Sequence, residues 1–326
     1  MEVKRRTAKS LVTKLSSVSE LTRTEALCEL RLITKHDPDA RSLIADAGAI
    51  PYLSETLYSS SPDAQENAAV TLLNLSINSK EALMSTRGLL DALSHVLRHH
   101  GPSSSTPDAA VQSAAATLHS LLIVDSYRPI IGAKRDIIYA LIDIVKCPNS
   151  PPRSVKDALK ALFGASLYAL NRSTMIQFGI VAALFGLILK DGRVGLVEDA
   201  TAVVAQIAGC EESEEAFRKV SGVGVLVDLL DAATGSSIRI KENSVSALLN
   251  LARCGGEGVV EDVRRMGLGV FDGINNVVEN GSPKGKNKAM ALLNLLDTRG
   301  LSSSSDGSNE NLFRHSRFDY LLHHSS

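Results

Sequence analysis

The sequence has no tryptophan, only 4% aromatic residues, and four widely spaced cysteines that form no CxxC pair. No secretory signal segment begins the chain, so we expect reduced cysteines and a cytoplasmic or nuclear location. Gly, Asp or Lys interrupts every apolar run before it reaches the roughly 20 residues that a membrane-spanning helix needs. These absences argue against a disulfide-framed secreted domain and predict that no segment spans a membrane.

Neither sign of charge is in excess, since the formal net charge is −1 at pH 7. Nucleic acids and anionic membranes attract proteins through surplus Lys and Arg, so we expect neither as a partner. One local basic feature is the run Lys284, Lys286 and Lys288. Two interpretations of this run stay open: contact with an acidic partner or a phosphate, and a solvated helix start.

Motifs of catalysis are missing as well. The sequence contains neither GxSxG nor HExxH, and it shows no strand-like alternation of polar and apolar residues. Gly267 to Gly273 resembles a dinucleotide-binding loop, but a charged segment precedes it instead of an apolar strand. His95 and His99 lie one helical turn apart, yet no Glu or Cys completes a metal site around them. We therefore predict a protein that is not an enzyme and that has no cofactor or metal.

The 326 residues are rich in Leu, Ala and Val, and three segments share a Leu-Leu-Asn-Leu centre with weaker copies between them. In chain order, the asparagine position of these copies holds Asn74, His119, Gly164, Gln206, Asn250 and Asn294. The intervals are 45, 45, 42, 44 and 44 residues, a period typical of armadillo or HEAT units. This period predicts an all-α solenoid whose repeats share one elongated core.

Prolines and glycines mark where the helices of each repeat begin. Pro62, Pro107 and Pro152 each stand 12 residues before the repeated position, and Pro283 stands 11 before it. Proline suits the first turn of a helix, where its missing N–H would have no partner. Glycine begins most of the second apolar helices, as at Gly48, and predicts a sharp turn there.

The repeats divide the chain into three parts. Lys4 to Ser16 is expected to form a helix that closes one end of the core, and Thr22 to Glu25 has the spacing of a capping box that opens the first full helix. We assign residues 1–22 to an N-terminal capping helix, residues 23–300 to about six repeats, and residues 301–326 to a disordered C-terminal tail.

Four segments, GAIPYL, QENAAVTLLNLS, KDALKALFGAS and GKNKAMALLNLL, resemble the armadillo repeats of plant U-box ubiquitin ligases. The resemblance covers about residues 22 to 298 and implies a right-handed superhelix of three-helix units. It also implies that the third helices line a concave groove that grips partner proteins. Only about 22 residues precede the first repeat, so we expect no U-box before it. Gly164, His119 and Gln206 depart from the Asn of that family, which predicts an irregular groove.

A second polar row stands seven residues before the repeated position, about two helical turns away, so both rows share one face. Side-chain amides offer donors and acceptors to the backbone of an extended peptide. We hypothesise that the partner-binding groove consists of Asn67, Asn74, Gln112, His119, Gln206, Asn243, Asn250, Asn287 and Asn294. In the alternative interpretation, these side chains bond to neighbouring helices or cap loops.

Two functions remain open. The first is a monomeric, non-catalytic scaffold or adaptor, with a kinase or a component of a ubiquitin-ligase pathway as candidate protein partners. The second is substrate recognition within a ubiquitin-ligase pathway, together with a separate U-box or RING protein. Basic nuclear-import signals are disfavoured, because nuclear-import adaptors carry Trp one turn before the groove Asn. Here that position holds Val70, Ala115, Lys160, Ala202, Ser246 and Met290.

Overall fold

The fold comes from a computed structural model that describes residues 2–101 and 104–298. All regular elements in these ranges are helices, and most of them form consecutive units of three. Two helices, α1 (Glu2–Leu15) and α2 (Glu20–His36), precede the units, and two short 3-10 turns, η1 (Asp125–Tyr127) and η2 (Ala232–Thr234), lie within them. The predicted tail at residues 301–326 lies outside the described residues.

Six units follow α2, and each contributes a first, a second and a third helix. The first helices are α3 (Pro38–Asp46), α6 (Lys80–Ser85), α9 (Arg128–Gly132), α12 (Leu170–Gln177), α15 (Ser213–Lys219) and α18 (Gly256–Arg265). The second helices are α4 (Ala49–Thr56), α7 (Leu89–Arg98), α10 (Arg135–Lys146), α13 (Ile180–Lys190), α16 (Gly222–Asp228) and α19 (Leu268–Asn280). The third helices are α5 (Pro62–Ser76), α8 (Asp108–Leu122), α11 (Pro152–Ser166), α14 (Val194–Ile207), α17 (Ile238–Cys254) and α20 (Pro283–Thr298).

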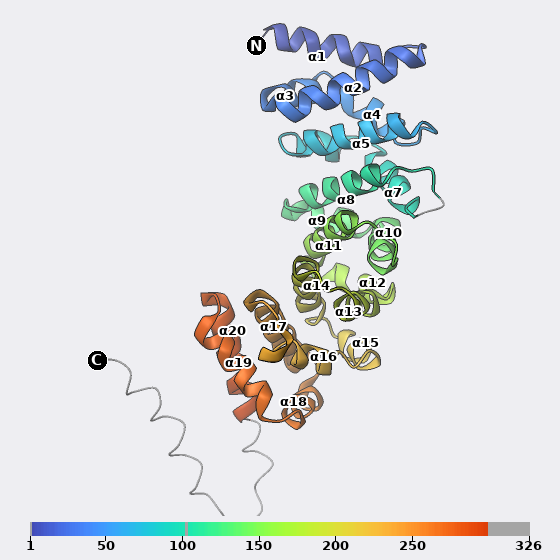
Figure 1. The fold of residues 1–326 in the computed structure, drawn as a ribbon. Helices are drawn as coiled ribbons and strands as arrows, with labels where there is room; N and C mark the ends of the chain where they lie inside the picture. The colour runs from blue at the N-terminus through green and yellow to red at the C-terminus, as the bar shows by residue number, and fades with distance from the viewer. Residues whose placement is uncertain (1, 102–103, 299–326) are drawn as a thin grey trace, which may run out of the picture.

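The third helices pack against one another in chain order, starting from α2 and ending at α20. We call this series the third-helix stack. Figure 1 shows that the molecule curves along its length and that α8, α11, α14 and α17 lie on the inner side of the curve, with α10 and α13 on the outer side. The repeat predicted from the sequence therefore corresponds to an all-α solenoid.

Local sequence signals explain most of the helix starts. Pro62 occupies the first turn of α5, and the Ser61 side chain before it accepts a hydrogen bond from the Ala64 backbone N–H at 3.4 Å. Gly48 precedes α4 with φ +86°, in the left-handed region that favours glycine. The predicted capping box was misplaced, because α2 begins at Glu20 and its cap is Ser19, whose hydroxyl accepts from the Thr22 N–H.

The core runs without a break along the solenoid. Leu118 and Leu249, each one residue before a repeated position, are almost fully buried, and so is Leu30 in α2. In α1, Leu11 and Leu15 are buried too, and α1 contacts α2, α3 and α4, so this helix closes one end of the core. No isolated unit could bury such a stripe, and the neighbouring unit supplies the missing surface.

Two of the third helices approach each other especially closely at Gly164. A Cβ atom added to Gly164 in α11 would lie 2.8 Å from the Leu122 Cβ in α8. Glycine therefore stands at the repeated position because the adjacent helix leaves no room for an Asn side chain.

Within the described ranges, no single helix is long and apolar enough to cross a membrane. The pair α12 and α13, bent by 71° at the break between them, has the length and composition of a span only when the two helices are taken together.

Candidate functional site

The clearest members of the two amide rows lie on one surface of the third-helix stack. Asn74 in α5 and both Asn243 and Asn250 in α17 are half-buried, with part of each side chain accessible. We call the surface of the stack that carries these three residues the inner face. It is the surface that the sequence proposes for binding a partner.

The donor side of these amides is used within the protein. The Asn74 Nδ2 donates to the Thr34 Oγ1 in α2 at 3.1 Å, and the Asn250 Nδ2 donates to the Ala205 carbonyl in α14 at 2.8 Å. The Asn243 Nδ2 donates to the Glu198 carbonyl at 3.2 Å and is 3.1 Å from the Thr201 Oγ1. Each amide therefore fastens its helix to the preceding helix of the third-helix stack, as the alternative interpretation of the rows predicts.

The side-chain oxygens of the same three asparagines, in contrast, are not used in bonds between the described helices. Among the described residues, no donor bonds to the side-chain oxygens of Asn74, Asn243 or Asn250. A hydrogen bond on Nδ2 fixes the amide plane, so each oxygen is held in a set direction. Amide acceptors fixed in this way suit the backbone N–H groups of an extended segment.

Asn67 differs from these three residues. It is 6% exposed, its oxygen accepts from the Arg31 Nη1 at 2.8 Å, and its Nδ2 lies 3.4 Å from the Cys28 Sγ. Arg31 also lies 3.0 Å from Glu66, which ties α2 to α5. Asn67 therefore has a packing role in the structure, and we leave it out of the proposed contact surface.

Charged residues take the place of asparagine in the middle of the stack. The Gln112 Nε2 in α8 donates to the Asp157 carboxylate in α11 at 3.3 Å, and Lys160 lies 3.6 Å from the same residue. His119 is half-buried and its Nδ1 has no hydrogen-bond partner in the described part of the chain. Burial, followed by the nearby Lys160, lowers the pKa of His119 below its ordinary value of 6.5, so the ring is neutral at pH 7.

The remaining predicted residues lie toward the C-terminal end. Gln206 in α14 is half-buried, whereas Asn287 and Asn294 in α20 are exposed. All nine predicted side chains thus belong to third helices, but they differ in environment. Asn67 is packed between helices, Asn74, Asn243 and Asn250 bridge repeats, and Gln112 and His119 lie in a charged centre. The irregularity expected from Gly164, His119 and Gln206 is present as a break in the amide row.

Sequence reasoning missed a set of arginines that cap the third helices. Arg41, Arg128 and Arg172 each donate from Nε to a carbonyl in the last turn of the preceding helix of the third-helix stack, at 2.7, 3.1 and 2.8 Å. Cations are favourable at helix C-termini, where carbonyl groups lack partners. Arg128 follows the repeated position His119 by nine residues and Arg172 follows Gly164 by eight, so the spacing is not constant and the pattern is hidden in the sequence.

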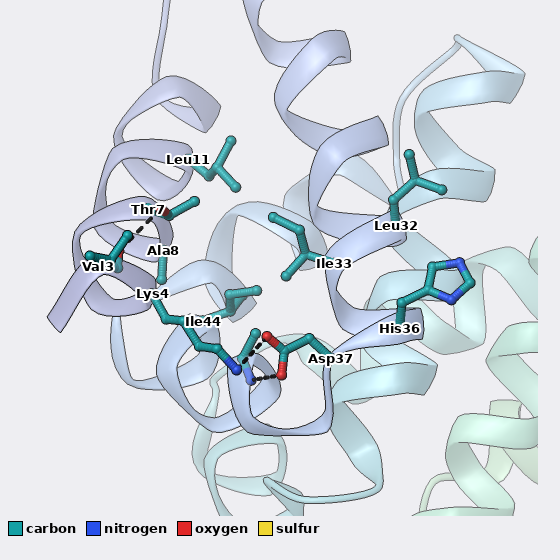
Figure 2. A pocket seen from close by; sticks show the side chains of 11 residues that line it. Val3, Lys4, Thr7, Ala8, Leu11, Leu32, Ile33, His36, Asp37 and Ile44 are labelled. Carbon is teal, nitrogen blue, oxygen red and sulfur yellow. Dashed lines mark hydrogen bonds and ion pairs between the residues drawn. The ribbon is translucent and has the colours of Figure 1, made fainter. Parts of the chain in front are cut away.

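A cavity of about 400 Å³ lies away from the amide rows, between α1, α2 and α3. Figure 2 shows its largely apolar lining, with Leu11, Ile33 and Ile44 among the side chains and Lys4 reaching Asp37. Lys4 and Asp37 form an ion pair at 2.7 Å. None of the nine predicted residues lines this cavity, so it is separate from the candidate site.

The family model for the armadillo-repeat region of plant U-box proteins matches residues 8–310. The chain belongs to this family. The U-box domain-containing protein 16 of Arabidopsis thaliana is 32% identical over 271 residues, which make up 82% of this chain and 38% of that protein. The chain thus spans about 40% of the length of the curated relatives it matches.

Solved structures support the armadillo fold. A structure concerning the interaction between cadherin and beta-catenin has a TM-score of 0.74 at 16% identity, and the match covers 90% of this chain and 55% of that one. Computationally designed armadillo repeat proteins for modular peptide recognition have a TM-score of 0.54 at 16% identity, over 88% of this chain and 98% of the other. At these identities, the likeness establishes the fold alone.

Proposed function

We propose that this armadillo-repeat protein is a non-catalytic scaffold that binds an extended segment of a partner protein along its inner face. The observation that carries the proposal is the set of amide oxygens on Asn74, Asn243 and Asn250, each fixed by a donated Nδ2 bond and each without a donor among the described residues. Backbone N–H groups are the partners that such acceptors fit, whatever side chains the segment carries.

Two further findings support this proposal. The family region that matches is the armadillo-repeat region of U-box proteins, not the U-box itself. Designed proteins of the same fold were made for modular peptide recognition. A repeat solenoid also offers a long contact surface, because each unit touches only its neighbours and leaves one face of its third helix accessible.

A second function follows from the same family membership. The chain would recognise substrates in a ubiquitin-ligase pathway and act with a separate U-box or RING protein. An in vitro ubiquitination assay with the purified chain distinguishes the two. Self-ubiquitination without an added ligase would overturn the non-catalytic scaffold, whereas modification of a captured partner only when a U-box protein is added would favour substrate recognition.

The binding proposal is tested by capturing partners with the wild-type protein and with the variant Asn74→Ala/Asn250→Ala. Loss of two backbone contacts at about 0.5–1.5 kcal/mol each predicts affinity roughly fivefold to 150-fold lower. Asn275→Ala is the matched control, because Asn275 is an exposed amide on the second helix α19. If every captured partner binds the double variant with unchanged affinity while circular dichroism shows a folded protein, the proposal is wrong.

A further inference from the structure

Positive charges on the inner face are balanced along most of the stack. Arg31 pairs with Glu66 at 3.0 Å, and Arg239 lies 3.9 Å from Glu198. In the middle, Lys156 pairs with Asp199 at 3.4 Å. Most of these pairs join successive third helices, so the cations here already have anionic partners.

The junction between α17 and α20 differs from these paired sites, because it brings together cations that have no close carboxylate in the described part of the chain. Lys284 and Lys288 on α20 and Arg253 on α17 have no carboxylate within 4.0 Å among the described residues. We call Arg253, Lys284 and Lys288, together with Ser246, the basic seam. The Lys288 Nζ donates to the Ser246 Oγ at 2.9 Å, which places this ammonium group between the two helices. Ser246 is 6% exposed, so the lysine is anchored at the bottom of the seam.

Lys284 and Arg253 each repel the ammonium group of Lys288. Lys288 is half-buried, and its pKa is lowered by burial and then by the nearby Lys284 and Arg253. Glu242 is the carboxylate that attracts Lys288, but its oxygens already accept hydrogen bonds from the Ser282 N–H and hydroxyl at the start of α20. These bonds leave the Glu242 carboxylate charged, so it offsets only one of the three cations and the seam keeps an excess of positive charge.

The position of the seam connects it with the amide row. Asn250 lies between Ser246 and Arg253 on α17, about one helical turn from each, so its free amide oxygen and the cations share one face. A segment that hydrogen-bonds to Asn250 would therefore place a neighbouring side chain at the seam. The bond between Lys288 and Ser246 differs from a solvated helix start, in which a lysine would extend into water and would bond to no neighbouring helix.

We propose that the basic seam binds a phosphorylated serine or threonine of a segment lying on the inner face. This inference rests on the proposed function, because the segment must first occupy the stack. A phosphate carries about −1.5 to −2 charges at pH 7 and three strong acceptor oxygens, which match three convergent cations better than one carboxylate does. Binding would neutralise the repulsion between Arg253, Lys284 and Lys288.

The test uses three immobilised degenerate libraries of peptides, identical except for a fixed central phosphoserine, serine or glutamate, and measures binding of the full chain. We expect the phosphoserine library to bind at least roughly tenfold more tightly than the other two, as charge-assisted hydrogen bonds predict. Lys284→Gln/Lys288→Gln should remove this preference and leave the serine library unchanged. Arg253→Gln, at an exposed position, gives the same prediction with less risk to folding.

Lys286→Gln is the matched control, because it also removes one positive charge from α20. The Lys286 Nζ lies outside the seam and donates to the Glu279 carbonyl. Equal binding of the phosphoserine and serine libraries would overturn the inference, and so would equal binding of phosphoserine and glutamate. A different result would overturn the proposed function, namely that Asn74→Ala/Asn250→Ala leaves binding of all three libraries unchanged. If no library binds, both are overturned.

Discussion

Replacing Gly164 by alanine sets helix propensity against close packing. Alanine is favoured over glycine in a helix interior by about 1 kcal/mol, so propensity alone predicts a more stable protein. The new Cβ would lie 2.8 Å from the Leu122 Cβ, an atom fixed to the backbone of α8 and unable to swing aside. Overpacking of this kind costs about 1–3 kcal/mol, so we expect a net loss of up to about 2 kcal/mol.

Gly186→Ala in α13 is the matched control. Gly186 also lies inside a helix, but a Cβ atom there would meet nothing within 4 Å, so this variant should gain about 0.5–1 kcal/mol. Urea denaturation followed by circular dichroism gives the overall change. Because a solenoid can lose two-state behaviour, hydrogen exchange of α8 and α11 should be measured as well. A Gly164→Ala protein as stabilised as the Gly186→Ala protein would refute the close-packing argument.

Three further predictions concern stability. The ammonium of Lys4 holds the pKa of Asp37 below its ordinary 3.8, so the pair stabilises α1 above pH 3.8 and its contribution is lost as pH falls through the lower folded value. Hydrogen exchange should show weaker α1 protection in Asp37→Asn at neutral pH. Because the pKa of His119 is lowered in the folded protein, the free energy of unfolding should decline as pH falls below 6.5. Urea denaturation midpoints measured on either side of pH 6.5 should decline less for His119→Gln than for the wild-type protein. Ser61→Ala removes the cap of α5 and should cost about 1 kcal/mol in urea denaturation, whereas Ser60→Ala should be neutral.

Much of the fold could be predicted from the sequence, because each signal acts over a few residues. Pro62 and Ser61 define a helix start by themselves, and Gly48 needs only its own backbone conformation. The start of α2 was misjudged because Ser19, Thr22 and the residues between them offer two overlapping capping patterns. Local rules do not decide which of two adjacent caps forms.

The chemistry of the site could be predicted only in part. The sequence places Asn74 and Asn250 on one face, but the direction of each amide depends on acceptors in another repeat, Thr34 and Ala205. These partners are 40 and 45 residues away, and the spacing of the packed helices determines whether they are reached. The basic seam likewise needs Lys288 beside Ser246, a contact that a linear reading of the lysine run does not contain.

The central claim is that a partner lies along the inner face, and site-specific photo-crosslinking tests it most directly. A photoreactive residue would replace Ala116 in α8 or Ala202 in α14, both half-buried on third helices, and Tyr52 or Tyr139 on the second helices as outer controls. With a partner recovered by capture, we predict adducts from the two alanine positions and none from the tyrosine positions. Adducts from Tyr52 or Tyr139 without any from Ala116 or Ala202 would contradict the account.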